Sequence, residues 1–256
     1  TRVKGVKVRD GKVVSATLEN TATGAVTEET CDVFFSTMPI RDLMGMMDPP
    51  PPAAVKTVAD GLQYRDFLTV GLLLKKLHVQ EKGTEPKADV PDTWIYIQDD
   101  GVQVGRVQFF NNWSPYMVAD QGSRWIGLEY FVNEGGTLWN TPDKDLIDLG
   151  VREMEQVGLA RREDLLDACV LRMRKAYPAY WGTYTELHLV REFVEGIPNL
   201  YLIGRNGMHR YNNQDHSMLT AMVAVDNLAA GRTDKSNLWE VNLDMIYHEA
   251  KEKTAN

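Results

Sequence analysis

Apolar and polar residues alternate over the first part of the chain in a pattern that predicts a β-meander. Valines at alternate or nearly alternate positions lead into Asp10-Gly11, a hairpin turn signal, and a second apolar stretch covers residues 13–18. Residues 31–37 have the pattern of a short apolar strand that ends in small polar residues. We therefore expect a β-meander over 1–37 and a short helix over 40–47.

Consecutive prolines at 49–52 interrupt this pattern, and a helix is expected directly after them, over 53–62. The polar segment 82–92 contains prolines and is expected to be a surface loop. Turns and loops, rather than helices, separate the strand patterns of this region, which favours antiparallel pairing. These strands are predicted over 67–74, 93–97, 102–110 and 125–132.

The second half of the chain mixes helical and strand patterns. A strand is predicted over 165–174, and 181–191 is ambiguous but compatible with a helix. Helices are predicted over 143–157, 215–230 and 237–251. For the first of these helices, Thr141 or Asp143 is the expected N-cap and Gly158 ends the helix.

The 215–230 helix has the strongest pattern. It is expected to begin at Asp215 as its N-cap and to end at Gly231. Its apolar side chains fall on one face at helical spacing. They are Met218, Ala221, Met222, Val225, Leu228 and Ala229.

Composition narrows the class of protein. The 256 residues suffice for one large or two small domains, and 43% apolar with 25% charged residues is ordinary for a globular chain. The net charge of −8 disfavours nucleic acid as a ligand. No segment of the sequence has the pattern of a membrane span or of a signal peptide. The spacing of Cys31 and Cys169 fits neither a disulfide framework nor a metal site. A cytoplasmic location is expected, with no metal site. The acidic run at 143–148 is interpreted as a solvated helix start.

The most informative segment is 199–218. An apolar run at 200–203 predicts a buried strand, a long glycine-bearing polar loop follows, and a helix opens near Asp215. A strand, a polar loop and a helix N-terminus together can hold an anionic or electron-rich cofactor edge, because backbone N–H groups and the helix dipole point at the loop.

Three motifs stand out: Gly204-Arg205-Asn206-Gly207 with residues 211–218, Ser36-Thr37-Met38-Pro39, and the strand pattern of 64–74. Together they resemble a FAD-dependent superfamily that includes amine oxidases, protoporphyrinogen oxidase-like and phytoene desaturase-like enzymes and UDP-galactopyranose mutases. The first motif resembles the C-terminal flavin-contacting segment of that superfamily, the second the strand end that closes the β-meander of its FAD domain, and the third the strand that enters its substrate domain.

The resemblance implies an α+β fold in two parts. A mixed, largely antiparallel sheet with covering helices forms a substrate-binding domain over 53–195. Residues 1–45 and 196–232 are the remaining parts of a FAD-binding domain, and 233–256 form a C-terminal helix. The N-terminal Gly-x-Gly-x-x-Gly segment of the superfamily is missing, so we interpret the chain as a C-terminal portion whose dinucleotide-binding partner segment lies elsewhere. FAD is expected in the parent and absent or weakly bound in this fragment.

The resemblance also implies which residues face the flavin. Arg205 and His209 are weak candidates for catalysis. The residues expected to contact the cofactor are Thr37, Pro39, Gly204, Arg205, Gly207, Tyr211, Asn213, Asp215, Ser217 and Met218.

The expected activity of the parent is hydride transfer from a small-molecule substrate to the flavin, and the fragment alone is expected to be inactive. Two alternatives stay open: a UDP-galactopyranose mutase-like enzyme, although Asn213 replaces that motif's carboxylate, and a non-catalytic binding module. A homo-oligomer is compatible with the sequence. Aromatic residues concentrated over 94–131 could line an apolar pocket, and Arg106 and Glu129 need partners if they face inward.

Overall fold

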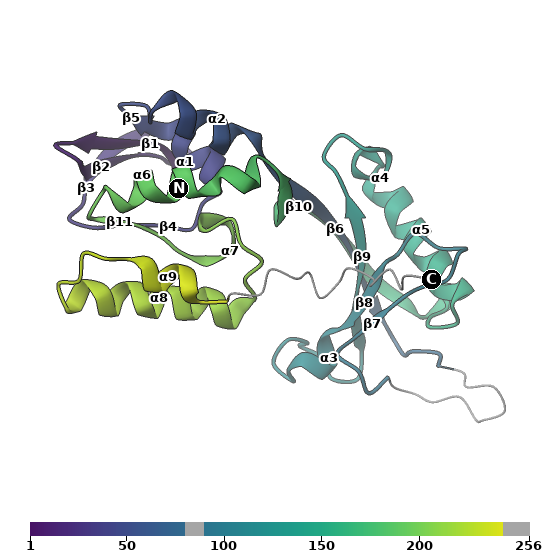
Figure 1. Cartoon of the computed structure of the whole chain (residues 1–256). Coiled ribbons are helices and arrows are strands. Elements are labelled where there is room, and N and C mark those ends of the chain that lie inside the picture. Colours follow the sequence, from purple (N-terminus) through teal and green to yellow (C-terminus); the bar gives the residue numbers. More distant parts are fainter. Residues whose placement is uncertain (80–89, 243–256) are drawn as a thin grey trace, which may run out of the picture. The chain divides into compact units, whose positions relative to one another are not determined.

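The computed structural model describes residues 1–79 and 90–242. The chain divides into two compact units (Figure 1). Unit 1 contains residues 1–64 and, of the described residues, 177–242, and unit 2 contains 65–176. The α+β class is confirmed, because each unit combines a sheet with helices.

Unit 1 contains the predicted β-meander, now seen as a four-stranded sheet in the order β3-β2-β1-β5. The β1–β2 hairpin turns at Asp10-Gly11, where both residues have positive φ, as the sequence predicts. Its strands are β1 (Arg2–Arg9), β2 (Lys12–Glu19), β3 (Val26–Thr30) and β5 (Met47–Asp48).

A second, two-stranded parallel sheet in unit 1 pairs β4 (Phe34–Ser36) with β11 (Leu200–Leu202). These strands lie between the helices α6 and α8 in Figure 1, and β11 is buried along its whole length. The helices of the unit are α1 (Ile40–Met46), α2 (Ala53–Gly61), α6 (Leu187–Glu195), α7 (Gly204–Gly207), α8 (Gln214–Ala229) and α9 (Ser236–Glu240), with a 3₁₀ turn at Thr183–Glu186.

Unit 2 is built on a five-stranded sheet in the order β10-β6-β9-β8-β7. Strand β6 pairs with β9, β9 with β8, and β8 with β7, each in the antiparallel sense, which confirms the expectation for these strands. The strands of this sheet are β6 (Leu62–Leu74), β7 (Trp94–Tyr96), β8 (Arg106–Phe109), β9 (Arg124–Val132) and β10 (Leu165–Gly182), of which residues 62–64 and 177–182 belong to unit 1. Its helices are α3 (Phe110–Trp113), α4 (Thr137–Asn140) and α5 (Asp143–Gln156), and a 3₁₀ turn covers Arg162–Asp164.

Alternate residues of β6, β8 and β9 point into one core beneath α5. Leu68, Val70 and Leu72 of β6 are fully buried there, because the period of two along a strand places them on the same face. Glu153 of α5 is buried too, and its carboxylate accepts hydrogen bonds from the N–H groups of Gln103 and Val104 and from the hydroxyl of Tyr130. The helix is therefore fixed to the sheet by polar as well as apolar contacts.

Prolines begin three of the helices. Pro39, Pro52 and Pro142 occupy the N-cap positions of α1, α2 and α5, and each carbonyl accepts the first helical hydrogen bond. Proline fits there because a helix start leaves its missing N–H without consequence. The expected N-cap of α5, Thr141 or Asp143, was therefore wrong by one residue, while Gly158 with its φ of +76° does follow the helix end.

The compact units differ from the predicted domain boundaries. Residues 53–64 and 177–195, expected in the substrate domain, belong to unit 1. The reason is apolar packing: α2 and α6 share one core with β11 and α1, to which Val55, Val58 and Val190 contribute. Which unit serves a cofactor and which a substrate remains a prediction.

Several element predictions also need correction. The strand expected over 165–174 runs on to Gly182 as β10, and of the ambiguous stretch 181–191 only the part from Leu187 onward is α-helical. Asn213, not Asp215, is the N-cap of α8. Most of the predicted 82–92 loop and of the 237–251 helix lies outside the described residues.

Candidate functional site

The two glycines of the Gly-Arg-Asn-Gly motif bring α7 against the end of β4. A Cβ atom at Gly207 would lie closer than 3.0 Å to the carbonyl oxygen of Ser36 and 3.3 Å from the Cα of Thr37. Gly204 adopts a φ of +73°, and a Cβ built there would come within 4.0 Å of both Thr37 and Ser217. Glycine is therefore needed at position 207, where α7 approaches β4 closely, and at position 204, where the backbone adopts a positive φ. The 204–218 segment and the Ser36–Pro39 strand end, two of the motifs singled out in the sequence, therefore lie in contact.

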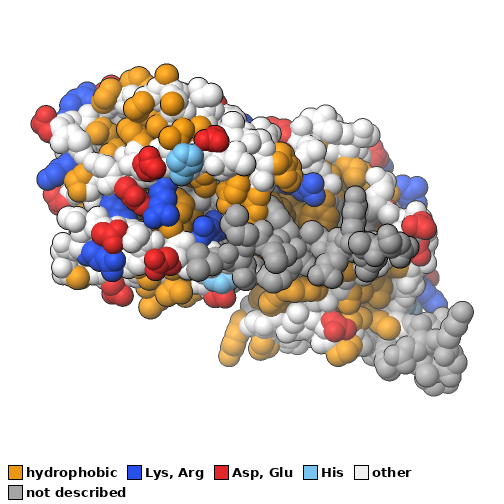
Figure 2. Space-filling model, viewed as in Figure 1, with side chains coloured by type: hydrophobic (Ala, Val, Ile, Leu, Met, Phe, Trp, Pro, Cys, Tyr) orange, Lys and Arg blue, Asp and Glu red, His pale blue; other side chains and the backbone are white. Residues whose placement is uncertain are grey.

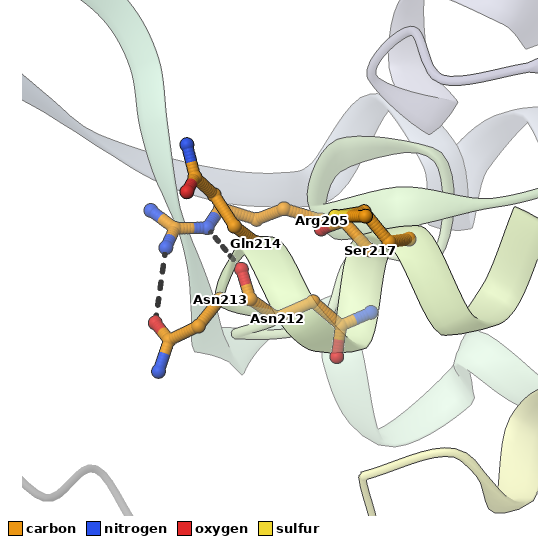
Figure 3. A pocket seen from close by; sticks show the side chains of 6 residues that line it. Arg205, Asn212, Asn213, Gln214 and Ser217 are labelled. Carbon is orange, nitrogen blue, oxygen red and sulfur yellow. Dashed lines mark hydrogen bonds between the residues drawn. The ribbon is translucent and has the colours of Figure 1, made fainter. Parts of the chain in front are cut away.

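Arg205 projects from α7 and is held by several groups (Figure 3). Its Nε donates to the carbonyl of Asn212 at 2.8 Å, and its Nη2 lies 3.5 Å from Oδ1 of Asn213. The guanidinium carbon lies 5.1 Å and 4.8 Å from the ring centroids of Tyr177 and Tyr211, whose rings stack on each other at 5.5 Å. The positive charge is therefore fixed in position rather than mobile.

An open pocket of about 450 Å³ lies beside Arg205. At its edge α8 begins, and Asn213 makes no side-chain capping hydrogen bond. Within residues 1–79 and 90–242, the N–H groups of Gln214 and Asp215 donate to no other group of the chain. A cation and a helix N-terminus thus meet at one pocket, which favours a negatively charged or electron-rich ligand. The pocket is lined by Arg205, Asn212, Asn213, Gln214, Ser217 and Met218.

Polar contacts to the C-terminal part of the described chain brace the loop between α7 and α8. Arg210 donates to the carbonyls of Trp239 and Asn242 at 2.6 and 2.9 Å. The side chain of Asn242 donates in turn to the carbonyl of Tyr211 and to Oδ1 of the buried Asn212. The loop that carries the pocket is consequently rigid, although it contains no regular structure between Arg210 and Asn213.

His209 lies behind this loop and does not line the pocket. It is fully buried, its Nε2 lies 3.0 Å from the carbonyl of Ala179, and its ring meets the ring of Tyr64 edge-on at 4.8 Å. Its Nδ1 has no hydrogen-bond partner within the part of the chain that the structure describes. Because burial disfavours the charged imidazolium, the pKa of His209 falls to about 4. These contacts give the residue a packing role as a neutral imidazole.

His209 is therefore expected to make the protein sensitive to acid. The unfolded chain takes up a proton near pH 6.5 and the folded chain only near pH 4, so the unfolding free energy is complete above pH 6.5 and falls by about 3 kcal/mol as the pH drops to 4. Urea unfolding across this range measures the slope. His209→Gln should reduce the slope, whereas the same change at the exposed His188 should not. Equal slopes in all three proteins would refute this assignment.

The remaining predicted site residues separate into two groups. Thr37 lies at the glycine junction, and Tyr211 stacks beside Arg205. Pro39 caps α1, and the side chain of Asp215 is mostly exposed and accepts the N–H of His216. Neither of these two lines the pocket.

Sequence reasoning missed three contributors to the site. Asn212 and Gln214 line the pocket, and the asparagine- and glutamine-rich run 212–214 was the available signal. Tyr177, at the far end of β10, packs on Arg205 and Tyr211, although nothing near it in the sequence indicates this contact.

A second polar cluster lies on unit 2, on the sheet face opposite α5. The Nε of Arg106 donates to the carboxylate of Glu129, as does the side-chain amide of Gln108, and Arg106 and Glu129 are both buried. The guanidinium of Arg106 lies 5.7–5.9 Å from the ring centroids of Trp94, Tyr96 and Phe131. Both charges are therefore buried and pair with each other.

No helix in the described part of the chain is long and apolar enough to cross a bilayer. Nor is there a group of three or more metal-ligating side chains among these residues.

Comparison with known proteins defines the fold. No family model and no curated protein matches the sequence. Among solved structures, a reduced UDP-galactopyranose mutase matches 93% of this chain with a TM-score of 0.65 at 21% identity. A candidate protoporphyrinogen oxidase from Exiguobacterium sp. 255-15 matches 91% with a TM-score of 0.60 at 14% identity. A fatty acid isomerase from P. acnes that produces CLA matches 88% with a TM-score of 0.53, also at 14% identity.

These neighbours confirm the resemblance drawn from the sequence, at the level of the fold. Their length differs from that of this chain. The chain spans 47% of the mutase and of the candidate oxidase, and 46% of the isomerase.

Proposed function

We propose that this chain is part of a FAD-dependent oxidoreductase and that unit 1 supplies the wall on which the flavin ring rests. The observation that carries the proposal is the junction at which Gly204 and Gly207 bring α7 onto the end of β4, directly beside the open N-terminus of α8. The fold shared with the mutase and the candidate oxidase supports the same reading.

The groups at this junction fit one edge of a flavin. Reduction of the ring places negative charge on its N1–C2=O side, and the N–H groups of Gln214 and Asp215 with the dipole of α8 would stabilise such charge by about 0.3–2 kcal/mol. Because Gly207 carries no side chain, the main chain of α7 lies directly against the end of β4, which keeps this junction in place beside the ring edge. Arg205 adds a fixed positive charge at the same pocket.

When bound, FAD would accept a hydride from a C–N or C–C bond of a small-molecule substrate. The residues of this chain would orient the ring, exclude water from its edge and balance its charge. We assign this role to Thr37, Gly204, Arg205, Gly207, Asn213, Ser217 and Met218. We assign no general base, because His209 is buried away from the pocket.

A UDP-galactopyranose mutase-like reaction is the second candidate, because the mutase structure is among the neighbours. In that case reduced flavin acts on a sugar without net oxidation. Asn213 supports the first candidate instead, since the mutase motif has a carboxylate at this position.

The proposal predicts that the isolated 256-residue chain purifies colourless, while the complete protein is yellow with one FAD per chain. The reason is that the described residues offer the ring edge a wall but contain no glycine-rich turn for the pyrophosphate. Visible absorbance and released flavin measure the outcome. Anaerobic bleaching by a substrate identifies an oxidoreductase, and conversion of UDP-galactofuranose by reduced enzyme identifies a mutase. Stoichiometric flavin in the isolated chain, or none in the complete protein, contradicts the proposal.

A further inference from the structure

One end of unit 2 is built from sequence without charged side chains. Residues 93–98 and 107–119 contain no Lys, Arg, Asp, Glu or His, although 25% of the chain is Asp, Glu, Lys or Arg. The first range contains β7, the last strand of the sheet at this edge, and the second contains most of β8, all of α3 and the start of the loop after it. Because β7 pairs with β8, the two ranges lie side by side.

Large apolar side chains at this end face solvent. Trp94 and Trp113 are 42% and 44% exposed, and their ring centroids lie 5.3 Å apart. Tyr116 and Met117, in the loop after α3, are 96% and 53% exposed. Figure 2 shows hydrophobic side chains projecting from the part of unit 2 that carries α3. We call Trp94, Trp113, Tyr116 and Met117 the aromatic tip. Exposed apolar side chains that are grouped rather than scattered indicate a contact surface.

Hydrogen bonds fix the loop that carries the tip. The N–H of Met117 donates to the carbonyl of Ser114 at 3.1 Å, which closes a turn with Pro115 in its second position. The side chain of Asn112 donates to two carbonyls of the segment 90–92, at 2.6 and 2.7 Å. The turn therefore holds its apolar side chains outward instead of folding them onto the sheet.

The charges that border the tip are acidic. Asp92, Asp99 and Asp120 stand next to the two uncharged ranges and are exposed. The fourth bordering residue, Arg106, is buried and donates to the carboxylate of Glu129. An anionic partner is thus repelled here, and the net charge of −8 adds to that repulsion. A partner with exposed cationic groups is attracted by the carboxylates and by the faces of the aromatic rings.

These properties together match the surface of a zwitterionic bilayer. Trp and Tyr are enriched where membrane meets water, because each combines an apolar ring with one polar group. The outermost group of a zwitterionic phospholipid is an ammonium, which suits both the rings and the acidic border. A projecting turn can enter the deformable headgroup layer, whereas a protein partner would need a hollow shaped to receive it.

We propose that the aromatic tip binds the surface of a zwitterionic phospholipid bilayer, with the turn 114–117 at the boundary between headgroups and acyl chains. Binding of this kind is interfacial and needs no spanning segment. The proposal concerns where the protein resides, and it does not depend on the flavin-binding role proposed above.

The test is co-sedimentation of the complete protein, and of the 256-residue chain, with vesicles of phosphatidylcholine. Tyr116→Ser with Met117→Ser should lower the partition coefficient by at least about tenfold, because it removes apolar area from the interface. The matched control is Leu171→Ser with Met173→Ser, at positions of β10 that are 56% and 51% exposed, and it should bind within about twofold of the unchanged protein. Replacing about a third of the lipid by anionic phosphatidylglycerol should weaken binding.

Several results would overturn the proposal. They are no binding of the complete protein to phosphatidylcholine, an equal loss in the control, and stronger binding to the anionic vesicles. A dimer that the Tyr116 and Met117 variant abolishes would assign the tip to a second copy of the chain. The thermal midpoint of this variant should match that of the unchanged protein, because both side chains are exposed. A clearly lower midpoint would mean that the tip is buried within the protein, which also contradicts the proposal.

Discussion

Gly207→Ala is expected to lower the unfolding free energy by about 3 kcal/mol and to remove flavin binding from the complete protein. The new methyl group would come closer than 3.0 Å to the carbonyl oxygen of Ser36, which is backbone and belongs to a paired strand. Neither partner can rotate away, so α7 must separate from β4. This opens the junction that positions Arg205. Urea unfolding of the isolated chain and flavin content of the complete protein measure the two effects.

Gly45→Ala is the matched control. Gly45 lies in α1, and a Cβ there has no atom within 4 Å. Alanine favours a helix over glycine by about 0.5–1 kcal/mol, so this variant should be slightly stabilised. If both variants have the same unfolding free energy, Gly207 is not required for the close approach of α7 to β4.

Arg106→Met is expected to cost about 3–5 kcal/mol, because it leaves the buried carboxylate of Glu129 without its counter-charge. Three aromatic rings surround the guanidinium, so water has little access to replace it. Chemical unfolding gives the loss.

Arg174→Met provides the comparison. Arg174 pairs with Glu134 at 2.8 Å, but both side chains are more than half exposed, so the loss should stay below about 1 kcal/mol. Adding Glu129→Leu to Arg106→Met should recover most of the stability, because the orphaned charge disappears. A double variant as unstable as the single one would mean that the arginine acts by packing instead.

Much of the fold could be predicted because local patterns specify it. The Asp10-Gly11 hairpin, the helices that follow the prolines and the antiparallel strands of unit 2 all depend on residues close in sequence. Unit boundaries could not be predicted in the same way. The α2 helix joins unit 1 because its apolar face matches α1 and α6, and no single segment encodes such a match.

The site was predicted in part for the same reason. Gly204 and Gly207 were identified from a motif, since glycine is the residue that a close approach demands. Tyr177 could not be identified from the sequence, because it is distant from Arg205 along the chain and contacts it only in the folded structure. The sequence also did not show that the apolar stripe of α8 is exposed in this structure. A stripe of apolar residues predicts that one helix face makes contacts, but it does not identify the surface that the face contacts.

Unit 2 is one continuous stretch of chain that leaves unit 1 along β6 and returns along β10, and these two strands are neighbours in the sheet. Its entry and exit are therefore adjacent, as in an inserted domain. A short linker from Tyr64 to Tyr177 could bypass it while keeping the α7–β4 junction, and a different insert could take its place. Such an arrangement would allow evolution to exchange one module without rebuilding the other.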